Sequence, residues 1–294
     1  MRLLTTEEYL ATERPQLSWL VKDLVPEPGV VLIESPPKGG KSFLAYDLAR
    51  CVSQGIPFLN RQTKQARTLY LQFDTSELVW RDRLLKIRAS GTDISGPLYT
   101  VHPEDMKLPI NILNPADRHW LSQAVEHCDP ALVVLDVYRE IHNADENDST
   151  QMKVVGDILT SIFKERSLVL VHHSKKIGED NFNPDPTSSA RGSSYITGKV
   201  DGIWLLWNNK LKIHSRVSEP LNVSLKQGVN GLWSLSYPTS EDLDKAVLQL
   251  CHDFPTSNHH TLSKLAEQQL GLSKNEYFKA LSQLVCPHSN KSSP

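Results

Sequence analysis

The stretch that most constrains the fold is residues 34–42, Glu-Ser-Pro-Pro-Lys-Gly-Gly-Lys-Ser, which separates an apolar run from an expected helix. The run before it, Val30–Glu34, is short, β-branched and preceded by Pro28-Gly29, a pattern typical of a buried strand. After the loop, small and aliphatic residues recur at helical spacing until Gly55, a typical helix-ending residue. The sequence therefore predicts an α/β fold in which the first long strand leads through this loop into a helix.

The second half of the loop has the composition of a phosphate-binding site, matching the second half of the Walker signature. Backbone amides of such a loop and of the following helical turn point at phosphate, and the helix dipole favours the negative charge. In this motif Lys41 reaches the β- and γ-phosphates and the Ser42 hydroxyl ligates Mg²⁺. The motif's first glycine is replaced by Ser35. The predicted nucleotide-binding residues are Pro37, Lys38, Gly39, Gly40, Lys41, Ser42 and Phe43.

A glycine-rich strand-to-helix turn with a chance Lys-Ser pair is the alternative to nucleotide binding, and the strand–loop–helix context favours the nucleotide. The sequence contains no evident base-reading motif, so GTP stays open beside ATP.

The bulk composition is that of a soluble protein. The 294 residues have a formal net charge of −2, which gives no general attraction to nucleic acid, so any such site must be local. Four cysteines lie far apart without a CxxC pair, which argues against a zinc site and for a reducing compartment. No stretch is apolar enough to cross a membrane. We expect a cytoplasmic location.

Two later strands end in carboxylates. Thr68–Phe73 closes on Asp74, and Ala131–Asp136 is a continuous apolar run that ends in Asp136. The second run is the Walker B pattern, a buried parallel strand that delivers an aspartate beside Mg²⁺. Helices are expected over residues 77–90, 115–127 and 149–165, and the acidic segment 143–148 is expected to be a solvated connection.

A third buried strand, Ser167–His173, ends in two histidines. A polar end to an apolar strand of an α/β sheet points to the crevice where ligands bind. A pair of ordinary surface histidines is the alternative. The following segment, 174–192, has no periodicity, and loops of that length are usually functional or disordered.

From Tyr195 onward the pattern changes to strands alone. The runs at 201–207, 211–214, 221–225 and 231–235 are separated by turn signals, and we expect them to extend the sheet in antiparallel fashion. Their tryptophans are expected to be core residues.

Pro238 marks a boundary, beyond which three short helices are expected at about 243–250, 261–270 and 273–284. They resemble a helix-turn-helix module. This module could recognise DNA. The alternative is a protein-docking or lid domain, which is favoured by the fact that the segment is not basic overall. The predicted division of the chain is an N-terminal arm 1–16, an ATPase domain 17–237, a helical module 238–286 and a disordered tail 287–294. Leu17–Val21 is expected to pack beneath the ATPase domain.

In its order of motifs the chain resembles the RecA-like P-loop ATPases of the RepA-type (AAA-domain) hexameric helicase family. The matching segments are Pro37–Ser42, Leu69–Asp74 with Arg83-Leu84, Val133–Asp136 with Glu146-Asn147, Leu170–Ser174 and Arg191–Ser194. The resemblance implies a RecA-like core with a mainly parallel central sheet, and covers about residues 17–237.

The resemblance also implies roles for particular residues. Lys41 and Ser42 bind phosphate and metal, and Asp136 holds Mg²⁺. Asp74 polarises the attacking water, and His173, or less well His172, senses the γ-phosphate. Mobile loops after the Asp136 and His173 strands hold single-stranded DNA, with Lys175 and Lys176 as phosphate contacts. The family assembles into rings, so a homo-oligomer, with a hexamer favoured, is implied.

Two positions depart from the family pattern. The water-activating residue is normally Glu, whereas this chain has the shorter Asp74, with Glu77 near it in sequence. In the family an arginine finger acts on the neighbouring subunit, and its position is occupied by Asp201 in this chain. The nearest cation in the sequence is Lys199, and Arg191 is the candidate replacement for the finger.

The function expected first is an oligomeric, Mg²⁺-dependent ATPase acting on DNA, as a replicative-type helicase or translocase of a plasmid, phage or mobile element. The alternative is an ATP-gated, slowly hydrolysing assembly or regulatory protein that recruits partners through its C-terminal helices. A plain DNA-binding repressor would leave the Walker residues unexplained.

Overall fold

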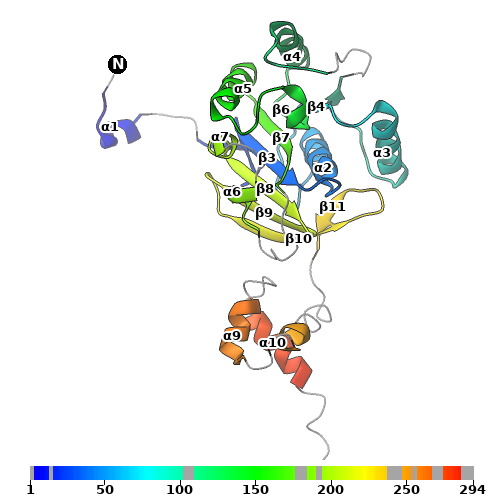
Figure 1. The fold of residues 1–294 in the computed structure, drawn as a ribbon, viewed down its shortest axis with the longest axis vertical. Helices are drawn as coiled ribbons and strands as arrows, with labels where there is room; N and C mark the ends of the chain where they lie inside the picture. Colours follow the sequence, from blue (N-terminus) through cyan, green and yellow to red (C-terminus); the bar gives the residue numbers. More distant parts are fainter. Residues whose placement is uncertain are drawn as a thin grey trace, which may run out of the picture.

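A computed structural model describes residues 3–12, 16–101, 109–175, 184–189, 194–236, 247–252, 254, 257–266 and 274–285. Its centre is a nine-stranded sheet in the order β11-β10-β9-β8-β3-β7-β6-β4-β5, with helices on both faces (Figure 1). The expected α/β fold with a mainly parallel sheet is confirmed.

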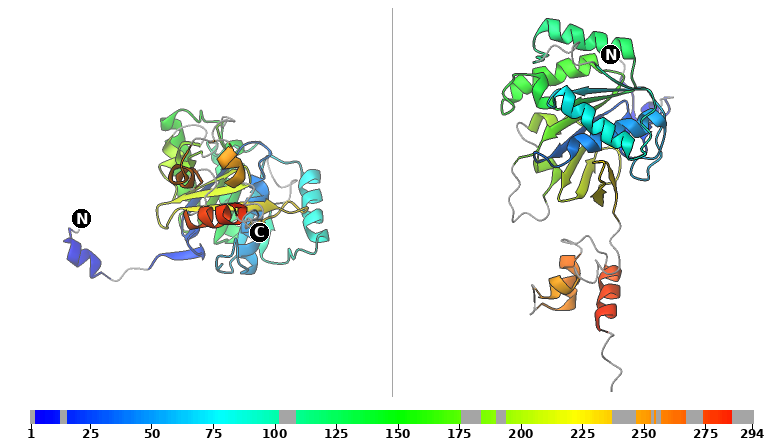
Figure 2. Two further views of the ribbon diagram at one scale, coloured as in Figure 1. Left: turned by 90° about the horizontal axis from the view of Figure 1, so that it is seen from below. Right: turned by 90° about the vertical axis from the view of Figure 1, so that its right-hand side faces the viewer.

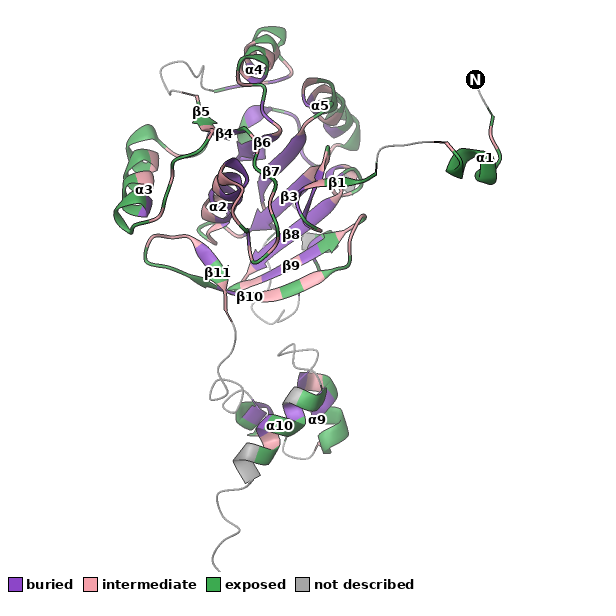
Figure 3. Ribbon diagram, turned by 180° about the vertical axis from the view of Figure 1, so that it is seen from behind, coloured by how far each residue is buried: buried purple, intermediate pink, exposed green. Residues whose placement is uncertain are grey.

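The parallel part of the sheet contains six strands: β3 (Val30–Ser35), β4 (Thr68–Gln72), β5 (Leu98–Thr100), β6 (Leu132–Asp136), β7 (Ser167–His173) and β8 (Gly202–Trp207). The inner strands are buried on both faces, which is why they read in the sequence as continuous apolar runs (Figure 3). β7 has the predicted bounds. The bounds of β3, β4, β6 and β8 differ from the predicted bounds by one residue at one end.

Helices cover the two faces of the sheet. α2 (Lys41–Gln54) and α3 (Glu77–Ala89) pack on one face, whereas α4 (Pro115–Cys128), α5 (Ser149–Ile162) and the short α7 (Ser194–Thr197) cover the other (Figure 2). Side chains of β3 and β7 alternate accordingly: Val31 and Ile33 join the α2 core, whereas Leu32 and Leu170 join the α5 core. This alternation decides which face each residue at a strand end reaches.

The antiparallel extension is also confirmed. β9 (Lys210–Ser215), β10 (Leu221–Gln227) and β11 (Trp233–Leu235) follow β8 and pair in sequence order. β11 begins two residues later than predicted because Gly231 has a φ of +85° and belongs to the turn. Trp204 and Trp233 are buried, as expected of core residues.

Residues 1–16 were predicted to be an arm or a short docking helix, and the structure has a short helix there, followed by a small separate sheet. α1 (Thr6–Leu10) is a short helix capped by Thr5 and Glu8. β1 (Ser18–Val21) and β2 (Val25–Glu27) form a separate two-stranded antiparallel sheet. Leu20 and Val21 belong to the core beside α2, so the expected packing of Leu17–Val21 beneath the sheet is confirmed for these two residues.

The described C-terminal residues form helices at 247–252, α9 (His259–Leu265) and α10 (Lys274–Val285). The predicted helical residues 243–246, 267–270 and 273 lie outside the described residues. These helices share a hydrophobic cluster of their own, made of Val247, Leu250, Leu262, Ala266, Tyr277 and Ala280. Within the part of the chain that the structure describes, no helix combines the length and apolar character needed to cross a membrane.

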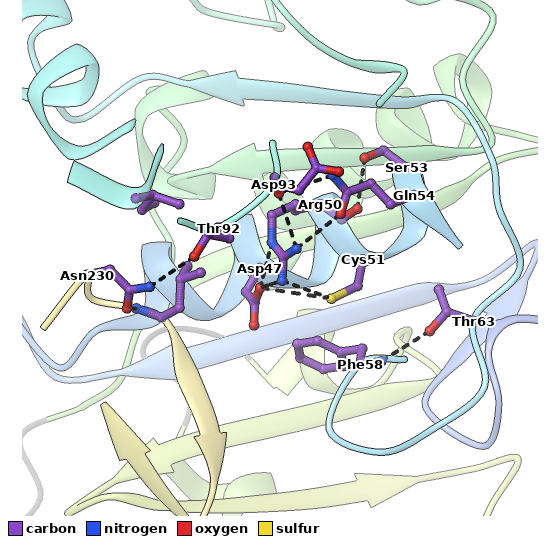
Figure 4. Close-up of polar contacts among 12 residues, drawn as sticks. Asp47, Arg50, Cys51, Ser53, Gln54, Phe58, Thr63, Thr92, Asp93 and Asn230 are labelled. Carbon is purple, nitrogen blue, oxygen red and sulfur yellow. Dashed lines mark hydrogen bonds and ion pairs between the residues drawn. The ribbon is translucent and has the colours of Figure 1, made fainter. Parts of the chain in front are cut away.

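A polar network fixes α2 to the segment that follows α3 (Figure 4). The Arg50 guanidinium lies 2.7 Å from Asp47 Oδ1, and both side chains are nearly buried. Arg50 also donates to Gln54, whose amide donates to the carbonyl of Asp93 at 3.1 Å. Burial raises the pKa of Asp47, an effect that the Arg50 charge opposes. The network therefore depends on the ion pair being complete.

Removing one member of the Asp47–Arg50 pair should lower the free energy of unfolding more than removing both. Arg50→Met leaves the Asp47 carboxylate buried without its cation, and we expect a loss of about 3 kcal/mol in the free energy of unfolding. Asp47→Leu combined with Arg50→Met should lose less. Urea denaturation measures both, with Lys86→Met in the exposed Asp82–Lys86 pair as a control expected to change stability by under about 0.5 kcal/mol. A double variant less stable than Arg50→Met would contradict this account.

Candidate nucleotide-binding site

Four neighbouring parallel strands bring the predicted site residues to one edge of the sheet. β3 leads into the 36–40 loop, and its neighbours β7, β6 and β4 end at His173, Asp136 and Gln72. The register pairs Ser35 with His173 and Gln72 with Asp136. In open α/β sheets this carboxyl edge is where ligands bind.

The phosphate-loop segment folds back tightly on its own start. The Gly39 N–H donates to the Pro36 carbonyl at 3.0 Å, and Lys38 and Gly40 have φ values of +63° and +86°. A Cβ at Gly39 would lie 2.8 Å from Ser35 Oγ, so Ser35 fits because residue 39 is glycine. The loop ends at the N-terminus of α2, a 14-residue helix whose first amides face the carboxyl edge.

Lys41 is buried at the start of α2, and its Nζ lies 3.2 Å from His173 Nδ1. A protonated lysine is a donor only, so Nδ1 accepts and the imidazole proton lies on Nε2. Burial lowers the pKa of Lys41, whereas the charges of Asp136 and Asp74 raise it. A phosphate at Lys41 would act in the same direction as these carboxylates and stabilise the ammonium form.

The Asp136 carboxylate is completely buried and receives three hydrogen bonds. Oδ1 accepts from Ser42 Oγ at 3.2 Å, and Oδ2 accepts from Tyr70 at 2.7 Å and from Gln72 Nε2 at 2.8 Å. Burial raises the pKa of Asp136, and the Tyr70 and Ser42 hydrogen bonds and the Lys41 charge oppose the rise. Burial also raises the pKa of Tyr70, which keeps its hydroxyl a donor.

Gln72 joins Asp136 to the turn that carries Asp74. Its Nε2 donates to Asp136, and its Oε1 accepts the backbone N–H groups of Asp74 at 2.8 Å and Thr75 at 3.1 Å. The Asp74 side chain is exposed at the carboxyl edge, and so is that of Glu77 at the start of α3. Neither Tyr70 nor Gln72 was predicted from the sequence to belong to the site. The detectable signal was one face of the strand that carries Thr68, Tyr70 and Gln72, whose side chains can form hydrogen bonds, opposite a face that is apolar.

The two histidines of β7 point to opposite faces of the sheet. His173 reaches Lys41, whereas His172 Nε2 lies 3.6 Å from Glu146 Oε1 on the face covered by α5. Glu146 is only 8% exposed, and the ring of Tyr138 packs edge-on against His172. The expectation of a solvated 143–148 connection is therefore wrong for Glu146, which turns inward to face a buried imidazole.

The oxygen ligands suit a magnesium ion that is also bound by phosphate. Ser42 and Asp136 supply a hydroxyl and a carboxylate 3.2 Å apart. No group of three or more His, Cys, Asp or Glu side chains capable of holding a metal occurs among the described residues. Mg²⁺ characteristically takes one or two carboxylates and completes its shell with water and substrate phosphates.

Other predicted residues lie away from this edge or outside the described residues. Lys176 and Arg191 belong to the latter group. Lys175 is exposed just after β7. Asp201 lies at the opposite, amino edge of the sheet, where its Oδ2 accepts the Val30 N–H at 2.8 Å, so this side chain stabilises the start of β3. Lys199, near Asp201, lies over the ring of Tyr195.

Comparisons with known proteins agree with the fold. The model of the AAA domain family matches residues 1–179. No curated protein matches the sequence. Among solved structures, the ATPase domain of G40P aligns at 14% identity and a TM-score of 0.53, covering 71% of this chain and 85% of its own.

A KaiC-like protein from the hyperthermophilic archaeon Pyrococcus horikoshii aligns at 10% identity and a TM-score of 0.50, covering 74% of this chain and 94% of its own. At these identities the solved structures establish the fold, and the family match covers more than half of the chain. The protein therefore belongs to the AAA domain family and has the fold of a RecA-like P-loop ATPase.

Proposed function

We propose that the protein is an Mg²⁺-dependent ATPase that acts on DNA as an oligomeric, replicative-type helicase or translocase of a plasmid, phage or mobile element. The observation that carries the ATPase part is the meeting of Lys41, Ser42, Asp136 and His173 at the end of a glycine-containing loop and the start of a helix. That arrangement supplies cationic and amide donors for phosphate beside oxygen ligands for a metal.

In this proposal each residue has a distinct task. The loop amides and Lys41 hold the β- and γ-phosphates, and Asp136 with Ser42 would hold the metal, which neutralises phosphate charge when bound. Asp74 orients the attacking water from the turn that Gln72 fixes. His173, already in contact with Lys41, is placed to sense whether a γ-phosphate is present.

A second candidate function is an ATP-gated assembly or regulatory protein with slow turnover. It is favoured by the short carboxylate of Asp74, because a displacement of about 1 Å at a reacting group can cost on the order of a hundredfold in rate. The C-terminal helices, which have their own hydrophobic cluster, would recruit the partner. The domain boundaries at residues 17, 237 and 286 are part of the proposal.

The oligomeric and DNA-binding parts are supported by the motif resemblance and by Lys175. This lysine is exposed two residues past the end of β7, at the carboxyl edge that carries His173. We propose a homo-oligomeric ring, a hexamer by resemblance, in which Lys175 and Lys176 contact the phosphates of single-stranded DNA. Arg191 is the proposed finger residue.

Loss of the loop lysine should remove nucleotide binding. ATP with Mg²⁺ should raise the melting temperature of the wild-type protein, because a ligand that binds only the native state stabilises it. Lys41→Ala should abolish that shift in a thermal-melt assay. Lys164→Ala, which removes an exposed lysine just after α5, is the control expected to keep it. An unchanged shift in Lys41→Ala would exclude the assigned phosphate site.

The short side chain of Asp74 should limit the rate of ATP hydrolysis. Asp136→Ala and Asp74→Ala should each lower steady-state ATP hydrolysis by about a hundredfold or more, whereas Asp74→Glu should raise it by up to about a hundredfold. Single-stranded DNA is added in parallel to detect stimulation. Glu77→Gln is the control expected to have no effect. If Glu77→Gln rather than Asp74→Ala removed hydrolysis, the water-orienting role would move to Glu77.

Charge reversal after β7 should weaken DNA binding. Lys175→Glu with Lys176→Glu should reduce single-strand affinity and lower the slope of log K against log salt by about 1.4, since each phosphate contact contributes about 0.7. Fluorescence anisotropy across a salt series measures both quantities. Lys164→Glu, an exposed lysine just after α5, is the control. An unaltered slope would place the DNA site elsewhere, with the C-terminal helices next to be tested.

A further inference from the structure

The turn between β10 and β11 lies directly against the phosphate loop. The Trp233 indole N–H donates to the carbonyl oxygen of Gly40 at 3.1 Å, and Trp233 is only 6% exposed. A Cβ added to Gly40 would lie 2.6 Å from Trp233 Cζ2. Gly40 is therefore constrained twice, by its left-handed φ of +86° and by the indole that packs on it.

A second contact of the same hairpin involves the residue after Ser42. Gly231 packs so closely on Phe43 that a Cβ at position 231 would overlap the ring. The Arg83 guanidinium of α3 lies 5.5 Å from the centroid of the Phe43 ring. Arg83 also donates to Thr75 Oγ1 at 3.4 Å, in the turn beside Asp74. Phe43 thus contacts both the hairpin and α3.

A third contact fixes the tip of the hairpin to the end of α3. Asn230 Nδ2 donates to Ser90 Oγ at 3.0 Å and to Thr92 Oγ1 at 3.3 Å (Figure 4). Asn230 Oδ1 accepts the Leu232 N–H at 3.1 Å, which holds the turn itself. The hairpin is therefore attached to α2 through Gly40 and Phe43, and to α3 through residues 90–92.

We propose that the β10–β11 hairpin is a brace that holds the phosphate loop in its nucleotide-binding conformation, with Trp233 as the positioning residue. The inference rests on the proposed nucleotide binding and adds a residue beyond the 1–179 family match. Its physical basis is the planar trans peptide between Gly40 and Lys41, in which C=O and N–H point in opposite directions. Because Trp233 fixes the Gly40 oxygen on one side, the Lys41 N–H is directed to the other side, toward the phosphates.

The brace matters for affinity because glycine-containing loops have many accessible conformations. A loop that must be ordered by its ligand binds that ligand more weakly than a loop that is ordered beforehand. The Gly40 oxygen also accepts the Leu44 N–H at 3.1 Å, the first hydrogen bond of α2. Trp233 therefore orients a peptide unit that belongs both to the cradle and to the first turn of the helix.

The test is Trp233→Phe, which keeps an aromatic ring and removes the indole donor. Trp207→Phe is the matched control, because Trp207 lies in β8 and its indole nitrogen has no hydrogen-bond partner among the described residues. We expect Trp233→Phe to weaken ATP binding about fivefold to tenfold, as for one lost hydrogen bond. KM should rise with kcat changed less. The change in tryptophan fluorescence on adding ATP should be lost in Trp233→Phe and kept in Trp207→Phe.

Hydrogen exchange of the wild-type protein is a second measurement, and it needs no substituted protein. Nucleotide should slow exchange at the amides of residues 228–235, and unchanged exchange there would overturn the brace. Equal ATP affinity in Trp233→Phe, Trp207→Phe and wild type would also overturn it while leaving the proposed function intact. Failure of the wild type to bind ATP would overturn both.

Discussion

The buried carboxylate of Asp136 is the interaction on which the rest of the site depends. A charge without water must be surrounded by donors, and here three side chains provide them from β4 and α2. Two of these donors are fixed in turn: Gln72 also holds the Asp74 turn, and Ser42 belongs to the first turn of the helix that follows the phosphate loop. The position of one carboxylate therefore sets the relative positions of the loop, the proposed metal ligands and Asp74, the residue proposed to orient the attacking water.

The sheet places contacts of two adjacent histidines on its two opposite faces. Because neighbouring residues of a strand face opposite sides, His173 meets Lys41 on the α2 side while His172 meets Glu146 on the α5 side. His173, which contacts Lys41, is therefore adjacent in sequence to a histidine that faces a buried carboxyl group on the other side of the sheet. The first of these contacts involves the proposed nucleotide, and the second anchors the segment that follows Asp136.

Much of this fold is readable from sequence because buried parallel strands are apolar throughout. Ser167–His173 was bounded correctly, and the change to antiparallel strands after Tyr195 was visible in the turn residues. Local patterns could not reveal that Glu146 turns inward, since an acidic segment is ordinarily solvated, nor that Ser18–Val21 pairs with Val25–Glu27. The contact between Trp233 and Gly40 joins distant parts of the chain, and only the order of strands brings them together. The roles of the site residues remain predictions.

The place of β8 in the sheet has a consequence for how this chain can be divided. β3, which carries the phosphate loop, is hydrogen-bonded to β7 on one side and to β8 on the other. A fragment that stopped at residue 179 would contain the whole family match yet leave β3 with one bare edge of valine, leucine and isoleucine. Unprotected apolar edges of that kind pair with other chains and aggregate. The strands that follow residue 179 thus cover an edge of the strand that carries the phosphate loop, although they lie outside the family match.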